Sequence, residues 1–118
     1  MSAPLESYLR TYRKRSGFSQ DEVAFLLGST SGAKVSRYEW LARQPTLPTV
    51  FAYEVIFRTP ARDLFAGLYQ KVEKETISRA RLLARKLAQA RARRTTPRKL
   101  AVLESLSSGL ASPQLEQR

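Results

Sequence analysis

Two long cations near the N-terminus, Lys34 and Arg37, are the side chains best placed for direct recognition of a ligand. They fall within a helix predicted at about 32–40, in which Val35 and Tyr38 share one face because residues i and i+3 lie together. That spacing leaves both cations on the outer face. Lysine and arginine on such a face donate hydrogen bonds to base edges in the DNA major groove, and a merely solvated helix face is the alternative. We therefore expect nucleic-acid recognition here.

The residues before this helix predict another helix and a turn. Ser19 has the side chain of an N-cap, and Glu22 three residues later completes a capping box. The glycine- and serine-rich segment 28–32 favours a turn, after which Ser31 is able to cap the helix that carries the cations. The predicted inward face of the earlier helix consists of Val23, Ala24 and Leu27. The sequence thus predicts two short helices joined by a turn.

This arrangement resembles the lambda-repressor-like helix-turn-helix family, which includes Cro and the XRE regulators. The similarity extends from about Leu9 to Phe65, and the matching residues have the family's spacing almost throughout. They are Arg13, Gly17, Ser19, Gln20, Glu22, Ala24, Gly28, Val35, Ser36, Arg37, Tyr38, Glu39 and Pro45. The resemblance implies an all-α fold in which a five-helix domain binds double-stranded DNA through the helix at 32–40.

The family's contacts, carried over position by position, define a set of DNA-binding residues. They are Gln20, Thr30, Ser31, Gly32, Ala33, Lys34, Ser36 and Arg37. In the family Gln20 would contact a phosphate or brace the first recognition residue, and an ordinary solvated residue is the alternative. Gly32 and Ala33 have no side-chain donor, so they would contribute close approach or contact with a thymine methyl. Arg13 and Glu39 occupy positions that pair in the family, and the resemblance implies a structural ion pair.

Two departures from the family pattern fall where the family makes its contacts. Between Gly28 and Val35 the chain has one residue more than usual, which shifts any base-contact assignment by one position. Leu41 stands where the family commonly has glycine, a residue suited to the left-handed backbone at a helix end. The helix is therefore expected to run on or to end differently. For the neighbouring Trp40 three roles stay open: a core residue, a dimer contact, or a contact on the phosphate side.

The residue types present exclude most catalytic and metal chemistry. With no Cys and no His among 118 residues, disulfides, zinc fingers, thiol nucleophiles and imidazole catalysis are excluded. No paired carboxylates, nucleophile with a base, or phosphate-cradling glycine loop is recognisable, so we predict no enzyme activity, cofactor or metal site. No apolar run approaches the ~20 residues of a membrane span, and the N-terminus lacks the apolar core of a secretory signal. We expect a soluble cytoplasmic protein without membrane contact.

The net charge of +11 is unevenly distributed. Residues 1–62 hold nine basic and five acidic groups, whereas residues 63–94 hold nine basic and three acidic groups. A basic surface binds polyanions through counterion release without reading sequence. Between Arg79 and Arg94 all charges are positive, so this part of the chain suits a nucleic-acid backbone or an acidic protein partner.

Three further helices are expected to complete the domain at 1–66. They are predicted at about 5–15, at about 49–57, and from Pro60 onward with Thr59 as its cap. The residues expected to pack in their core are Leu5, Tyr8, Leu9, Tyr12, Val50, Phe51, Tyr53, Phe57, Leu64 and Phe65.

Beyond this domain we expect a helical extension at 67–108 and a flexible tail at 109–118. A long basic helix should continue to about Arg93, and a short C-terminal helix should follow at about 97–108, capped at Thr95-Thr96 and ended by Gly109. The long helix carries a seam with coiled-coil-like spacing. Its members are Tyr69, Val72, Thr76, Ala80, Leu83, Leu87 and Ala90.

Together these patterns predict a sequence-specific transcription regulator of the repressor type that binds an inverted repeat as a homodimer. Pairing two modules is the usual way for small DNA-binding domains to reach specific affinity, and the extension at 67–108 is the expected means. The resemblance to small phage and bacterial repressors implies a protein that associates with the nucleoid when bound. Two alternatives stay open: an antitoxin-like or other protein-interaction module using the basic C-terminal helices, and a non-specific nucleic-acid or RNA binder.

Overall fold

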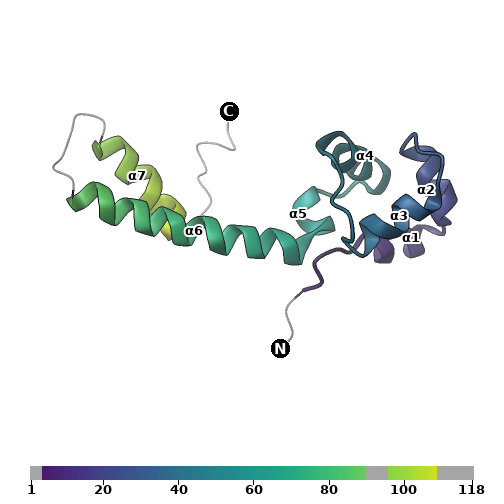
Figure 1. Cartoon of the computed structure of the whole chain (residues 1–118), viewed down its shortest axis with the longest axis horizontal. Coiled ribbons are helices and arrows are strands. Elements are labelled where there is room, and N and C mark those ends of the chain that lie inside the picture. Colours follow the sequence, from purple (N-terminus) through teal and green to yellow (C-terminus); the bar gives the residue numbers. More distant parts are fainter. Residues whose placement is uncertain (1–3, 90–95, 109–118) are drawn as a thin grey trace. The chain divides into compact units, whose positions relative to one another are not determined.

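The computed structural model describes residues 4–89 and 96–108, and all regular structure in these residues is helical (Figure 1). The helices are α1 (Leu9–Ser16), α2 (Gln20–Leu26), α3 (Gly32–Glu39), α4 (Leu47–Phe57), α5 (Ala61–Leu64), α6 (Ala66–Gln89) and α7 (Thr96–Ser107). The all-α class agrees with the expectation from sequence. The chain divides into two compact units, Met1–Gln70 and Lys71–Arg118, and the boundary falls inside α6.

One hydrophobic core joins α1 to α5 in the first unit. Each of these helices contributes at least one fully buried side chain, and because each has only 4 to 11 residues, none is expected to be stable outside this core. The buried residues are Leu9, Val23, Ala24, Val35, Tyr38, Tyr53, Leu64 and Phe65. Tyr53 is central, since its ring stacks on Phe57 at a centroid distance of 6.0 Å and meets Tyr38 edge-on at 6.3 Å.

The starts of α2 and α3 follow the predicted caps. The Ser19 hydroxyl accepts from the Glu22 N–H at 3.0 Å, and the Glu22 carboxylate accepts from the Ser19 N–H at 2.8 Å, which completes the capping box. At α3 the Ser31 hydroxyl accepts from the Ala33 N–H at 3.1 Å. These local bonds satisfy backbone donors that the first turn of a helix leaves unpaired.

The first helix is shorter than predicted. Leu5 is exposed and lies outside α1, which begins at Leu9, so the expected helix start at Leu5 is wrong. Residues 4–8 are held instead by contacts distant in sequence: the Tyr8 N–H donates to the Leu64 carbonyl at 2.7 Å, and the Leu5 carbonyl accepts from the Gly67 N–H at 2.8 Å. A Cβ on Gly67 would collide with the Leu5 backbone, so this close approach requires glycine.

Two expectations for α4 and α5 are also wrong. Phe51 was expected in the core but is 55% exposed. Thr59 does not cap α5, because its hydroxyl donates back to the Phe57 carbonyl. The Glu54 carboxylate, from α4, instead accepts from the Ala61 N–H at 2.5 Å and so satisfies the first turn of α5 from a neighbouring helix.

The second unit is a helical hairpin made of most of α6 together with α7, which runs back along it (Figure 1). Ala80 and Leu103 are its buried side chains among the described residues, and Arg81 Nη2 donates to the Ser107 carbonyl at 2.9 Å. Of the predicted seam, Ala80 is buried and Leu87 half-buried, whereas Tyr69, Val72 and Leu83 are exposed. The seam therefore does not form one continuous buried stripe.

Several expectations concern residues outside the described ranges. They include the extension of the long helix to Arg93, the Thr95 cap, the seam member Ala90, the helix end at Gly109 and the tail at 109–118. Within the described ranges no helix combines the length and the apolar character needed to cross a membrane.

Candidate nucleic-acid interface

The start of α3 is held against the first turn of α2. The Gly32 N–H donates to Asp21 Oδ1 at 3.1 Å, and a Cβ built on Gly32 would lie 3.2 Å from the Asp21 backbone nitrogen. Gly32 is buried in this contact. Only glycine allows the two helices to approach so closely, and the approach sets where the exposed face of α3 begins.

The end of α3 is held by a buried ion pair. Arg13 Nε donates to Glu39 Oε2 at 2.5 Å and Arg13 Nη2 donates to Glu39 Oε1 at 3.3 Å, which makes the pair bidentate. The side chains are 11% and 1% exposed, respectively. A third bond comes from α2, since Gln20 Nε2 donates to Glu39 Oε1 at 3.2 Å. The last turn of α3 is thus tied to both α1 and α2.

Tyr53 lies in the core beside this network. Burial, followed by the negative charge of Glu39, raises the pKa of the Tyr53 hydroxyl above its ordinary value of 10.0. The same hydroxyl has no hydrogen-bond partner among the described residues. It is a buried polar group that adds no bond to the fold.

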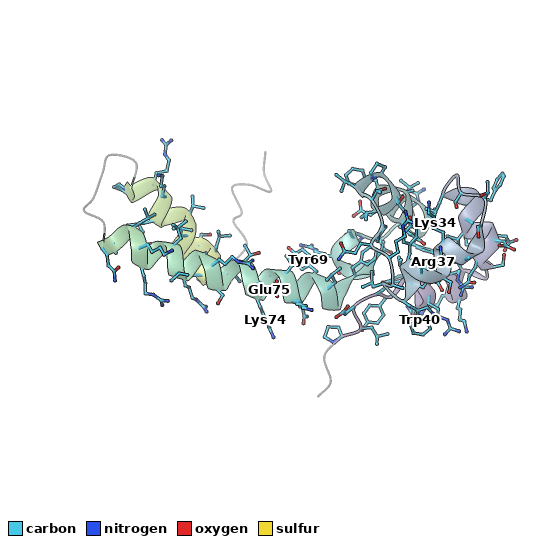
Figure 2. The ribbon with its side chains drawn as sticks, in the orientation of Figure 1. Lys34, Arg37, Trp40, Tyr69, Lys74 and Glu75 are labelled. Carbon is cyan, nitrogen blue, oxygen red and sulfur yellow. The ribbon has the colours of Figure 1, made fainter. Side chains whose placement is uncertain are left out.

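Between its two fixed ends, α3 presents one exposed ridge. Ala33, Arg37 and Trp40 follow the i, i+4, i+7 spacing of a single helix face and all are exposed, opposite the buried Val35 and Tyr38. Lys34 borders the ridge on one side and Ser36 on the other, and both are half-buried. Figure 2 shows Lys34, Arg37 and Trp40 on this part of the chain.

The structure does not bring all the predicted DNA-binding residues onto that ridge. Thr30 and Ser31 are exposed at its N-terminal end, although the Ser31 hydroxyl is used as the cap. Gln20 is half-buried and its amide donates to Glu39. Gly32 is covered by α2 and is not part of the exposed face of α3.

Leu41, which stands where the resembled family commonly has glycine, follows the C-terminal end of α3. Leu41 adopts the left-handed conformation, with φ 52°, that glycine takes most easily. The Ala42 N–H donates to the Arg37 carbonyl at 2.9 Å and the Leu41 N–H to the Tyr38 carbonyl at 3.1 Å, so the helix stops after Glu39 and does not run on. For leucine this conformation costs roughly 1–2 kcal/mol, which packing of its side chain against the core offsets.

A pocket beside Trp40 was not foreseen from the sequence. Trp40 is 69% exposed, and the guanidinium carbon of Arg10 lies 5.6 Å from the centroid of its ring. The sequence held a signal for the contact between Arg10 and Trp40, because Arg10 precedes Arg13 by one turn and Trp40 directly follows Glu39. An ion pair between Arg13 and Glu39 brings their neighbours together.

The described residues contain no group of three or more acidic side chains arranged to hold a metal ion. The network around Glu39 is used internally, and the exposed groups of α3 are hydrogen-bond donors and an aromatic ring. Exposed cationic donors of this kind can form ion pairs and hydrogen bonds with an anionic ligand. No protein-family model, curated protein or solved structure was found to match the chain.

Proposed function

We propose that this chain is a sequence-specific DNA-binding transcription regulator of the repressor type, which reads bases through α3. The observation that carries the proposal is the exposed ridge of α3, with Arg37 upon it and Lys34 at its edge, held at both ends by α2 and α1. A rigid helix with aimed cationic donors supplies what base-edge readout requires. The five helices α1–α5 are then a lambda-repressor-like helix-turn-helix domain, in which α2, the turn 27–31 and α3 form the DNA-reading unit.

The proposed contact set is smaller than the sequence suggested. Arg37 and Lys34 donate to base edges, Ala33 and Ser36 approach the bases, and Thr30 and Ser31 lie at the entry to the groove. Gln20 acts as a brace, because its amide holds the carboxylate that positions the end of α3.

We propose further that the protein binds an inverted repeat as a homodimer. The second unit supports this, because Val72 and Leu83 on α6 and Val102 and Leu106 on α7 are exposed aliphatic residues. On each helix they lie about a quarter-turn from Ala80 or Leu103, the residues buried in the hairpin. Since the two helices run in opposite directions, both pairs fall on the same side of the hairpin.

A second copy of the same hairpin is the proposed occupant of this aliphatic face. The matching faces of two hairpins would form a four-helix arrangement with a common core, whereas the described residues of one hairpin bury only the side chains of Ala80 and Leu103. Such a contact also supplies the two-fold symmetry that an inverted repeat requires.

The test of the proposed function is selection of bound sites from a random-sequence duplex pool at about 150 mM salt. The intact chain should enrich an inverted repeat. The double variant Lys34→Ala, Arg37→Ala should lose at least about thirtyfold in affinity for that site, because each good base contact contributes about 1–3 kcal/mol and each 1.4 kcal/mol corresponds to about tenfold. Arg62→Ala with Lys71→Ala removes the same charge from exposed positions outside α3 and is the matched control. Tight binding without any enriched motif would contradict sequence-specific regulation.

A protein-interaction module is the second function that a specific observation favours. Among the described residues of α6 from Arg79 onward, four cations occur and no acidic group. An acidic protein partner would complement this surface. If activity in the cell survives loss of Lys34 and Arg37 but fails when Arg79, Arg85 and Lys86 are replaced by glutamine, this second function replaces the first.

A further inference from the structure

Trp40 extends the exposed ridge of α3 to the helix's C-terminal end. It lies seven residues after Ala33, which corresponds to about 10 Å along the helix. The DNA major groove is about 12 Å wide. A helix whose N-terminal residues enter the groove therefore carries its far end to the phosphate-lined edge of the groove.

The pocket at that end has the composition of an anion site with an aromatic wall. Its volume is about 260 Å³, and Arg10 and Lys14, one turn apart on α1, line it together with Trp40. Glu6 and Glu39 also line it. The charge of Glu39 is already matched by Arg13, so the two cations outnumber the one remaining carboxylate.

The position of Trp40 is fixed rather than incidental. Trp40 is the C-cap of α3, the left-handed residue Leu41 follows it directly, and the guanidinium of Arg10 lies over its ring. At 69% exposure the ring contributes little to the core, although a tryptophan buries the largest apolar surface of any side chain when it is covered. The ring would bury its apolar surface, and so contribute binding energy, only when a binding partner covers it.

We propose that this pocket binds a phosphodiester of the DNA backbone at the groove edge, with Arg10 and Lys14 on the phosphate oxygens and the Trp40 ring against the sugar. The inference rests on the proposed function and adds a second contact class to it. Base donors on α3 select the sequence, whereas this pocket sets the register of α3 in the groove without reading bases. It also anchors α1 to the DNA.

The chain contains a single tryptophan, so selectively excited emission reports on Trp40 alone. The experiment uses the full chain and the duplex enriched from the random pool. Binding is followed independently by the anisotropy of a label on the DNA. When the duplex binds, acrylamide quenching of Trp40 should decrease, because the sugar covers the ring. An unchanged quenching constant in the saturated complex would overturn the proposal.

Variants separate the phosphate contacts from a general charge effect. Arg10→Ala and Lys14→Ala should each lower the slope of log K against log salt by about 1, because each removes about one phosphate contact. Glu6→Gln should strengthen binding. Arg15→Ala is the matched control, since Arg15 is an exposed cation on the same helix whose guanidinium lies 5.9 Å from the Tyr12 ring, outside the pocket. Equal slopes for Arg10→Ala and Arg15→Ala would contradict the site.

The two proposals fail in different ways. If no inverted repeat is enriched and a random duplex also leaves Trp40 accessible, both are wrong. If a site is enriched and bound while the quenching and the salt slopes stay unchanged, the regulator remains and only the phosphate site is excluded. Thermal unfolding of each variant checks that α1 and α3 remain folded.

Discussion

Arg13 and Gln20 donate to the same carboxylate oxygen, Glu39 Oε1, at 3.3 and 3.2 Å. They approach it from α1 and from the first turn of α2, and Arg13 makes a second bond to Oε2. The last turn of α3 is therefore positioned by side chains from two other helices. The buried Glu39 carboxylate therefore helps to set the direction in which the exposed ridge of α3 faces.

Replacing Glu39 with glutamine should lower the free energy of unfolding of the first unit by more than a substitution of an exposed residue would. The substitution leaves the Arg13 charge buried without a counter-ion, and breaking a buried pair in this way costs about 3–5 kcal/mol. Urea unfolding measures the loss. The double variant Arg13→Met, Glu39→Leu should recover part of the free energy of unfolding, because no unpaired charge remains. If both variants unfold at the same urea concentration, the pair is not the cause.

Gly32→Ala should destabilise the protein by about 1–3 kcal/mol, although glycine to alanine inside a helix ordinarily stabilises it. The added methyl meets the Asp21 side chain and lies close to the α2 backbone. Guanidinium unfolding gives the sign directly. Adding Asp21→Ala should return only part of the loss, since the backbone atoms stay in the way. A stabilised Gly32→Ala variant would mean that α2 and α3 are less closely packed than described.

Tyr53→Phe should leave the stability unchanged or raise it by up to about 1 kcal/mol, because it removes a buried hydroxyl that lacks a partner. The ring and its contacts with Phe57 and Tyr38 are kept. Thermal unfolding at neutral pH measures the effect. Tyr53→Leu, which removes the ring stacking, is the control and should destabilise clearly. A large loss in Tyr53→Phe would show that the hydroxyl is bonded after all.

The same residue predicts a dependence on alkaline pH. Because the pKa of Tyr53 is raised in the folded state, above pH 10.0 the unfolded chain releases this proton while the folded chain keeps it. Folding then becomes less favourable by up to about 1.4 kcal/mol per pH unit from this residue alone. Plotted against pH, the free energy of unfolding should fall more steeply for the intact chain than for Tyr53→Phe above pH 10.0. Parallel curves would contradict the raised pKa.

If the chain forms the proposed homodimer, Leu83→Asp should convert it into a monomer, because the substitution places a charge in the aliphatic face of the hairpin. Leu82→Asp is a closely matched control. Leu82 is 45% and Leu83 46% exposed, and these adjacent residues lie on different faces of α6. Sedimentation at tens of micromolar distinguishes them. An intact chain that sediments as a monomer with and without operator DNA would exclude the dimer itself.

Short-range patterns predicted the parts of this fold that short-range bonds determine. The caps at Ser19 and Ser31 involve residues two or three apart, so their spacing alone identified the starts of α2 and α3. The inward residues Val23 and Val35 followed from helical periodicity in the same way. The ridge of α3 could be placed because its position depends on these elements.

Contacts distant in sequence were beyond such patterns. The apolar spacing of Leu5 and Tyr8 is typical of a helix, but in the structure it belongs to an irregular segment bonded to Leu64 and Gly67. The cap of α5 comes from Glu54 rather than from Thr59 beside it. The pocket of Arg10 and Trp40 joins residues thirty positions apart, and only the packing of α1 on α3 brings them together.

Because the Gly67 N–H donates to the Leu5 carbonyl, hydrogen exchange at the Gly67 amide reports whether the N-terminal segment is in place. This N–H belongs to the first turn of α6, where no carbonyl of the helix itself is available, so its protection from hydrogen exchange depends on the Leu5 carbonyl. A peptide or tag joined ahead of residue 4 that pulled this segment away would expose the amide and fray the start of α6. Exchange at one glycine would then report whether an added sequence had disturbed the fold.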